Sequence, residues 1–339
     1  MTPGARVAAA IDILDEVLAG RPAEQVLTNW ARANRYAGSG DRAAVRDHVF
    51  DAIRCRRSFA ELGGAETGRG LMIGALREAG ADLGAVFSGQ GYAPAPLSER
   101  EALHRSLDGV PEPVRLDMPD WLFPALSQGL GEEYADELAI LRKRAPVFLR
   151  VNLGKADHGL ADSTLREDGI ESEPHPLARA SRRVAAGARR IRSSRAFADG
   201  LVELQDVASQ AVVENLGELR GTRVLDYCAG GGGKSLALAA LGAAVFAHDA
   251  DPRRMADLPD RARRAGVRIE ILTDEAAKPA APWPLILVDA PCSGSGAWRR
   301  QPEAKWQLTA DRLDDLASIQ ARILDEVASM IAPGGRLAY

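Results

Sequence analysis

Four consecutive glycines, Gly230–Gly233, interrupt an alternation of strand-like and helix-like patterns in the C-terminal half of the chain. An apolar run with Val224 and Leu225 precedes them, and a helical pattern over 234–241 follows. Glycines between a strand and a helix let the backbone approach a ligand closely, and the free N–H groups that begin the helix favour an anion. The sequence therefore predicts an α/β sheet with a ligand-binding loop after its first strand.

The remainder of this half predicts a doubly wound sheet. We expect further strands at 244–250, 267–272, 283–289 and 336–339, and helices at 252–266 and 313–330. The strand at 283–289 is apolar throughout its centre, as in a strand covered on both faces. We expect Pro333-Gly334-Gly335 to end the last helix, and, because Tyr339 falls inside the fifth strand, we expect the sheet to be C-terminally truncated.

Three kinds of ligand suit the glycine loop. Gly233-Lys234-Ser235 matches the end of a Walker A loop, but Cys228 stands where its first glycine is required, and a P-loop NTPase remains an alternative. A dinucleotide fingerprint requires a glycine where Ser235 stands. Asp249 closes the second strand, where an acid typically accepts hydrogen bonds from ribose hydroxyls. An adenosine-bearing ligand without a pyrophosphate fits best.

A second motif, Asp289–Gly296, follows the fourth strand at the carboxyl end of the sheet, where α/β enzymes place their chemistry. Asp289 and Cys292 lie three residues apart in a Pro/Gly-rich turn. A thiol and an acid that face one pocket suit the methylation of cytosine C5, which is too weak a nucleophile to take a methyl group unaided. A thiolate that attacks C6 makes C5 nucleophilic, and a carboxyl group at the N3/N4 edge of the base stabilises the developing charge. The competing interpretation of Cys292 is a small buried apolar residue.

The runs 226–235 and 289–306 together resemble the RsmB branch of the Nop/Sun family of RNA 5-methylcytosine methyltransferases. Leu204–Gln210 and Leu149–Asn152 resemble two further blocks of that family. The resemblance implies a Rossmann-like class I methyltransferase fold with S-adenosylmethionine as cofactor. It also implies methylation of cytosine C5 in RNA, most simply 16S-type rRNA, through a covalent cysteine adduct at C6.

The resemblance also assigns site residues. Asp289 would touch both cofactor and cytosine, and Cys292 would assist release of the product. The family's attacking cysteine lies in a Thr-Cys-Ser run after the fifth strand, so we expect it beyond Tyr339, which leaves a non-catalytic remnant as an alternative. The family usually has Ala-Pro where Gly230-Gly231 stand here. The residues expected at the cofactor are Cys228, Ala229, Gly230, Gly231, Gly232, Gly233, Lys234, Asp249, Asp274 and Asp289.

The N-terminal part predicts helices, because apolar residues recur at helical spacing over 7–18 and 45–53. By resemblance, residues 1–135 form a NusB-like helical RNA-binding domain, 136–200 a small α/β subdomain and 201–339 the cofactor-binding domain. Arginines crowd 182–195, which is either a solvated face or a strip of phosphate contacts. The expected RNA contacts are Arg150, Asn152, Arg189, Arg190, Arg299, Arg300 and Lys305.

Composition limits the remaining possibilities. A net charge of −4 argues against a chain that coats nucleic acid by bulk charge, but it allows a local basic site. The three cysteines and five histidines show no zinc-site spacing, so we expect no metal and no disulfide framework. No apolar run approaches the length of a membrane span. We expect a cytoplasmic monomer that binds RNA, without metal or membrane.

Overall fold

The chain folds into two structural units, and each unit is built from two separate segments of the sequence. The computed structural model describes residues 1–277 and 280–339, without the side chains of 274 and 275. The helical unit comprises Met1–Ala145 and Ser293–Asp314, and the sheet unit comprises Pro146–Cys292 and Asp315–Tyr339. Residues 293–314 had been expected in the cofactor-binding domain, and they group instead with the N-terminal helices.

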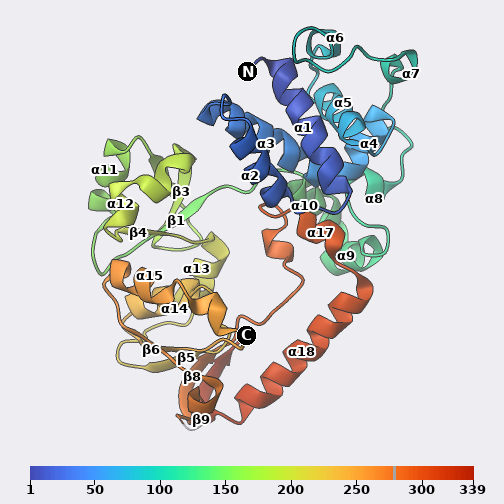
Figure 1. Cartoon of the computed structure of the whole chain (residues 1–339). Coiled ribbons are helices and arrows are strands. Elements are labelled where there is room, and N and C mark those ends of the chain that lie inside the picture. Colours follow the sequence, from blue (N-terminus) through green and yellow to red (C-terminus); the bar gives the residue numbers. More distant parts are fainter. Residues whose placement is uncertain (278–279) are drawn as a thin grey trace. The chain divides into compact units, whose positions relative to one another are not determined.

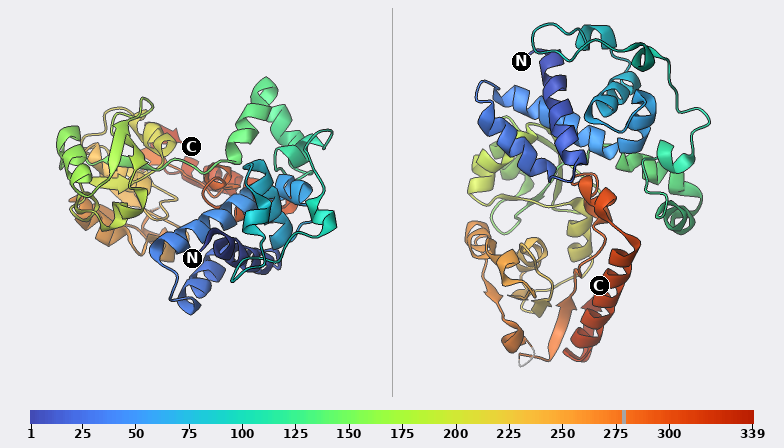
Figure 2. Two further views of the ribbon diagram at one scale, coloured as in Figure 1. Left: turned by 90° about the horizontal axis from the view of Figure 1, so that it is seen from above. Right: turned by 45° about the vertical axis from the view of Figure 1, so that its right-hand side comes forward.

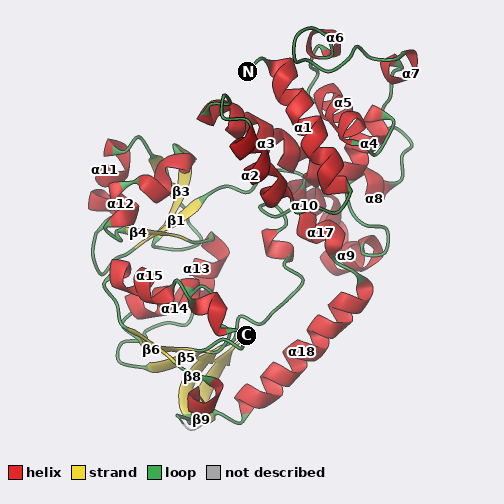
Figure 3. Cartoon of the chain, viewed as in Figure 1, coloured by secondary structure: helices red, strands yellow, loops and turns green. Residues whose placement is uncertain are grey.

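The helical unit has no strand among its described residues, as colouring by secondary structure shows (Figure 3). The sequence expectation of a helical N-terminal part is confirmed. Its elements are α1 (Pro3–Leu18), α2 (Ala23–Ala33), α3 (Ser39–Arg54), α4 (Arg56–Gly63), α5 (Gly68–Glu78), α6 (Leu83–Val86), α7 (Glu99–Ala102), α8 (Glu112–Arg115), α9 (Phe123–Leu130), the 3-10 turn η1 (Gly131–Glu133), α10 (Tyr134–Leu141), η4 (Ser295–Ala297) and α17 (Glu303–Gln307) (Figure 1).

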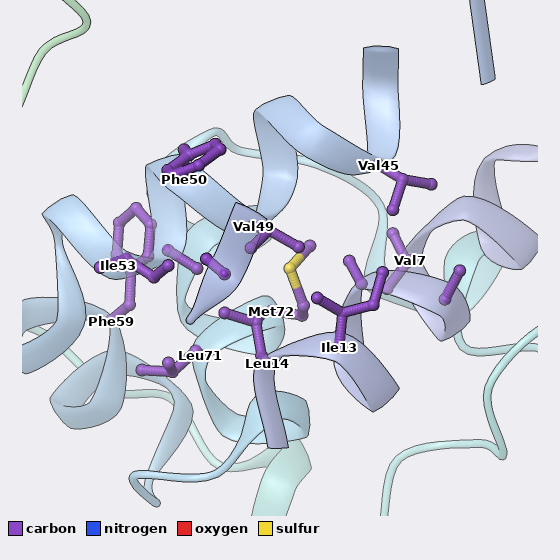
Figure 4. Close-up of a cluster of buried hydrophobic side chains, with 14 of the residues drawn as sticks. Val7, Ile13, Leu14, Val45, Val49, Phe50, Ile53, Phe59, Leu71 and Met72 are labelled. Atoms are coloured by element: carbon purple, nitrogen blue, oxygen red, sulfur yellow. The ribbon is translucent and has the colours of Figure 1, made fainter. Parts of the chain in front are cut away.

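The core of the helical unit lies where α1, α3, α4 and α5 meet (Figure 4). Leu14 of α1, Val49 of α3 and Met72 of α5 are fully buried there. The apolar positions of α1 and α3 recur every three to four residues, so each helix turns one apolar stripe toward the others. α1 starts at Pro3, and the hydroxyl of Thr2 accepts a hydrogen bond from the backbone N–H of Ala5, a standard N-terminal cap.

The sheet unit contains two sheets. The smaller one is antiparallel with strand order β2-β3-β1-β4, and its core packs against α11 and α12. Its last strand, β4, lies beyond residue 200, so the small subdomain extends further than the sequence boundary placed it. Its elements are β1 (Phe148–Val151), α11 (His158–Glu167), β2 (Glu171–Pro174), β3 (Ser181–Ala186), η2 (Ala188–Ser193), α12 (Arg195–Ala198) and β4 (Val202–Leu204).

The larger sheet is parallel, with strand order β7-β6-β5-β8-β9, and it confirms the predicted Rossmann-like α/β fold (Figure 1). Its elements are α13 (Val207–Glu214), β5 (Arg223–Asp226), α14 (Gly233–Ala240), β6 (Ala244–Ala247), η3 (Pro252–Met255), α15 (Leu258–Ala265), β7 (Ile269–Ile271), α16 (Asp274–Ala277), β8 (Trp283–Leu287), α18 (Ala310–Ala328) and β9 (Ile331–Ala338).

Helices cover both faces of this parallel sheet. Val224 and Leu285 point to one face, where they pack with α13 and α14. Leu225 and Ile286 point to the other face, where they pack with the end of α18. The turned view in the right panel of Figure 2 shows α18 running alongside the sheet. Burial on both faces explains why β5 and β8 are apolar at every central position.

Two predicted boundaries are wrong. The helix expected at 252–266 is divided into η3 and α15. The last helix ends at Ala328, before Pro333, and β9 already begins at Ile331. The proline and two glycines lie instead inside β9, where the pairing with β8 shifts register and Gly334 has φ +72°, as in a β-bulge. In the described parts of the chain, no helix has the length and apolar character needed to cross a membrane.

Candidate functional site

The glycine run forms the turn between β5 and α14, as the sequence predicts. Gly230 has φ +52° and Gly232 has φ +77°, in the left-handed region that side chains disfavour. A Cβ on Gly232 would lie 2.2 Å from Cδ1 of Leu258. The backbone N–H of Gly232 donates to the carbonyl of Ala229 at 2.8 Å, which closes the turn. Glycine is therefore required at 232 both for conformation and for space.

Asp249 lies beside this turn because β6 runs parallel to β5 and ends at the same edge of the sheet. Its Oδ2 accepts a hydrogen bond from the N–H of Gly230 at 2.9 Å, and its Oδ1 accepts one from the N–H of Asp251 at 3.0 Å. Arg254 forms an ion pair with the same carboxylate at 3.2 Å. The structure thus joins Asp249 to the glycine loop, as expected from the spacing of the two strands.

A cavity of roughly 290 Å³ opens at this edge of the sheet. The Nζ of Lys234 donates to Oδ2 of Asp289, which connects the loop after β5 with the motif after β8. Seven of the predicted cofactor residues line the cavity: Cys228, Ala229, Gly230, Gly231, Gly233, Lys234 and Asp289. Five further lining residues were not predicted from the sequence: Gln205, Ser209, Asp226, Arg254 and Arg261.

Two groups that line the cavity, Asp226 and Cys228, set its electrostatics. Burial raises the pKa of Asp226 to about 6, and the Ser235 hydroxyl donates to its Oδ2 at 2.6 Å. Among the described residues, its Oδ1 has no hydrogen-bond partner. Burial, with Asp249 and Asp226 nearby, raises the pKa of the Cys228 thiol to about 12. Cys228 is therefore protonated at neutral pH and is not a nucleophile.

The motif after β8 is more exposed than the loop after β5. The side chain of Asp289 is 59% exposed, and Cys292 is exposed. An exposed thiol is accessible to a substrate, unlike the small buried apolar residue that was the competing interpretation. Gln320 of α18 donates through Nε2 to the Pro291 carbonyl at 2.8 Å and so supports this turn. The side chain of Asp274, expected near the cofactor, lies outside the described residues.

Two of the expected RNA contacts in the sheet unit are wrong. Arg150 is 7% exposed, and burial lowers its pKa to about 10. Asn152 is also 7% exposed, and its Nδ2 donates to the carbonyls of Gly200 at 3.1 Å and Ala265 at 2.8 Å. Side chains enclosed in this way do not reach a phosphate at the surface of the unit.

Lys305, expected to contact RNA, is also buried, within the helical unit. Its Nζ donates to the carbonyl of Arg54 at 3.1 Å, and Nε1 of Trp306 donates to the carbonyl of Ile53 at 2.7 Å. These carbonyls end α3, where a helix leaves acceptors without an internal partner. Arg299 donates to the carbonyls of Lys143 and Arg144, both at 2.9 Å. Residues 299–306 therefore complete the helical unit.

The other expected RNA contacts, Arg189, Arg190 and Arg300, are exposed. Arg189 and Arg190 lie on the turn η2 of the small subdomain. Their role in RNA binding stays a prediction. Among the residues that the structure describes, no group of three or more His, Cys, Asp or Glu side chains could hold a metal ion.

Comparison with known proteins agrees with this geometry. The family model of the 16S rRNA methyltransferase RsmB/F matches residues 215–339, and that of the RsmF/B-like ferredoxin-like domain matches residues 118–187. The ribosomal RNA small subunit methyltransferase B of Klebsiella pneumoniae is 34% identical over 229 residues, which cover 65% of this chain and 53% of that protein. The chain spans about half the length of the curated relatives it matches.

Solved structures share the fold. A methyltransferase homolog protein from Pyrococcus horikoshii is 25% identical with a TM-score of 0.57, and the match covers 67% of this chain and 74% of that one. The protein PH0851 has a TM-score of 0.71 at 22% identity, and the match covers 99% of this chain and 85% of that one. With the glycine loop, Asp249 and the Asp289–Cys292 turn in place, the chain belongs to the RsmB/F family of small-subunit rRNA methyltransferases.

Proposed function

We propose that this protein uses S-adenosylmethionine to form 5-methylcytosine in small-subunit rRNA. The observation that supports this most directly is the cavity that the glycine loop and Asp289 line at the carboxyl end of the parallel sheet, with Asp249 hydrogen-bonded to the loop at Gly230. Ligands of α/β enzymes bind at this edge. We further propose that the helical unit is NusB-like and binds RNA, and that the protein acts in the cytoplasm as a monomer.

The residues of the cavity suit this cofactor. The backbone N–H groups that begin α14 favour the methionine carboxylate. Asp249 offers its remaining lone pairs to the ribose hydroxyls, because each carboxylate oxygen accepts more than one hydrogen bond. The free Oδ1 of Asp226, buried at the cavity, suits an amino group. Three cations line the cavity, and each already has an acidic partner: Lys234 is bonded to Asp289, Arg254 pairs with Asp249, and Arg261 pairs with Glu203. This pairing favours a ligand without a triphosphate.

The chemistry follows from the weak nucleophilicity of cytosine C5. S-adenosylmethionine supplies an electrophilic methyl group. A thiolate bonds to C6, C5 takes the methyl group, a base removes the C5 proton, and the C6–S bond then breaks. Asp289 holds the N3/N4 edge of the base and stabilises the charge that develops there. Cys292 assists release, and the family's attacking thiol belongs to a second cysteine after β9.

Cofactor identity is tested by isothermal titration of the chain with S-adenosylmethionine and with Mg-ATP. We expect the first to bind and the second not to bind. Asp249→Asn weakens the hydrogen bonds to ribose, and we expect at least a tenfold loss of affinity, about 1.4 kcal/mol. Asp260→Asn is the matched control, because its side chain is 77% exposed on α15. Tight binding of ATP without S-adenosylmethionine binding would establish the P-loop alternative.

The reaction is tested by methyl transfer to unmethylated small-subunit rRNA, followed by nucleoside mass spectrometry. With a protein that also carries the second cysteine after β9, we expect 5-methylcytidine as the labelled product. A label on the exocyclic N4 would contradict the cytosine C5 assignment. Binding of RNA and cofactor by this chain without transfer would support the non-catalytic alternative. Because C6 is hidden inside a duplex, we expect the target cytosine in a single strand or flipped out.

A further inference from the structure

The glycine loop needs support from outside itself. Four consecutive glycines have more freedom in the unfolded and open states than any other run, so ordering them costs more conformational entropy. In the resembled family, Ala-Pro at 230–231 would restrict this freedom. Here the backbone carbonyls of Gly231 and Gly233 are instead bound by side chains from other elements. Both sets of contacts lead back to the small sheet.

The first link starts at Arg150 on β1. Its Nη1 donates to Oε1 of Gln205 at 2.7 Å and to the carbonyl of Gly233 at 3.2 Å. Gln205 also donates to the Gly233 carbonyl, through Nε2, at 3.1 Å. Two side chains therefore bind the carbonyl of the residue that begins α14. They fix the first turn of the helix, whose residues Gly233 and Lys234 line the cavity.

The second link starts at Glu203 on β4. Its carboxylate pairs with Arg264 at 2.7 Å and with Arg261 at 3.5 Å. Arg261 in turn donates through Nη1 to the carbonyl of Gly231. The guanidinium of Arg264 lies 4.1 Å from the centre of the Phe197 ring, which restricts its position further. Glu203 therefore orients the arginine that binds the centre of the loop.

The two links share one origin. Arg150 and Glu203 are directly opposite each other in the antiparallel pairing of β1 with β4. Both are at least nine-tenths buried. A charged cross-strand pair at this depth is costly to desolvate, so its retention requires close partners. Those partners include the two loop carbonyls. Arg150 binds the carbonyl of Gly233 directly, and Glu203 acts on the carbonyl of Gly231 through Arg261.

We infer that the cross-strand pair Arg150–Glu203 of the small sheet positions the glycine loop for its ligand. These residues act through the loop backbone and are positioning residues, not contacts to cofactor or RNA. The inference rests on the proposed binding of S-adenosylmethionine at this loop. It implies that the small sheet sets cofactor affinity, so a change at β1 or β4 is transmitted to the cavity through two defined contacts.

The test compares two buried arginines of the same small sheet. Arg150→Met removes the first link. Arg182→Met is the matched control, because Arg182 on β3 is 5% exposed and pairs with Asp162, without touching the loop. We expect both variants to lose thermal stability. We expect only Arg150→Met to weaken S-adenosylmethionine binding, about tenfold by titration, and to accelerate amide hydrogen exchange over 230–234.

Glu203→Gln is a second test variant. The substitution keeps the shape of the side chain, and residue 203 does not line the cavity. We expect a three- to tenfold loss of affinity with little loss of stability, and partial recovery of affinity in Arg150→Lys relative to Arg150→Met. If wild type binds the cofactor and both Arg150→Met and Glu203→Gln bind it equally well, the positioning role is wrong. If wild type does not bind it, the proposed function itself fails.

Discussion

Gly232 and Gly233 are adjacent, but the structure predicts opposite effects when each is replaced by alanine. Gly232 has φ +77°, and a Cβ there would lie 2.2 Å from Cδ1 of Leu258, which is fully buried. Gly233 begins α14, and a Cβ there would meet only Nε2 of Gln205, at 3.8 Å, an ordinary contact. The two substitutions therefore add the same methyl group to very different surroundings.

The magnitudes follow from these surroundings. A left-handed conformation costs a non-glycine residue about 1–2 kcal/mol. Overpacking against a buried side chain adds about 1–3 kcal/mol. Gly232→Ala should thus destabilise the sheet unit by roughly 2–5 kcal/mol. Gly233→Ala should stabilise the sheet unit by about 0.5 kcal/mol, because alanine has a higher helix propensity than glycine. The gain is smaller than in a helix interior, since residue 233 is the first helical position.

The assay must report on the sheet unit alone, since a chain with two units need not unfold in one step. Trp283 is fully buried in the sheet unit, and the other four tryptophans, Trp30, Trp121, Trp298 and Trp306, belong to the helical unit. Fluorine NMR of 5-fluorotryptophan-labelled protein in urea therefore follows Trp283 separately. Equal urea midpoints for Gly232→Ala and Gly233→Ala would contradict the predicted difference between the two positions.

Three further predictions concern single residues. Burial lowers the pKa of Lys305 from 10.5 to about 8, so the unfolded state binds more protons between these values and stability should rise by roughly 3 kcal/mol from pH 8 to 10.5. Lys305→Met should flatten that rise in urea titrations, and an unchanged pH profile would contradict it. Iodoacetamide at neutral pH should label Cys292 before Cys55 and Cys228, whose pKa values burial raises to about 12; peptide mapping that finds Cys228 labelled first would count against this. In a protein that carries the second cysteine after β9, Cys292→Ala should trap a covalent RNA adduct, and denaturing gels without a slower band would argue against its role in release.

The parallel sheet and its loop could be predicted because their signals are local. An apolar run such as 285–288 predicts a strand buried on both faces, and a glycine run before a helix predicts a ligand loop. The parallel arrangement then brings Asp249 and Asp289 to the same edge without further information. Boundaries were less predictable, since Pro333 and the two glycines after it are as compatible with a bulged strand as with a helix end.

The roles of buried charged residues could not be predicted. Arg150 and Lys305 have the residue types of phosphate contacts, and only tertiary structure shows that they are enclosed. Arg150 is buried because β4 pairs with β1 and places Glu203 opposite it. Lys305 is buried because 293–314 folds with helices encoded some 250 residues earlier, where it binds the carbonyl of Arg54. Such long-range pairings leave no periodicity in the sequence.

Binding of S-adenosylmethionine in the cavity after β5 is tested most directly by photochemical cross-linking of the tritiated cofactor to the protein, followed by peptide mapping. We expect a label in peptides that contain Cys228–Lys234 or Asp289–Cys292. Excess S-adenosylhomocysteine should abolish it. A label confined to peptides of the helical unit, or one that survives competition, would contradict the assignment of the cofactor to the cavity after β5.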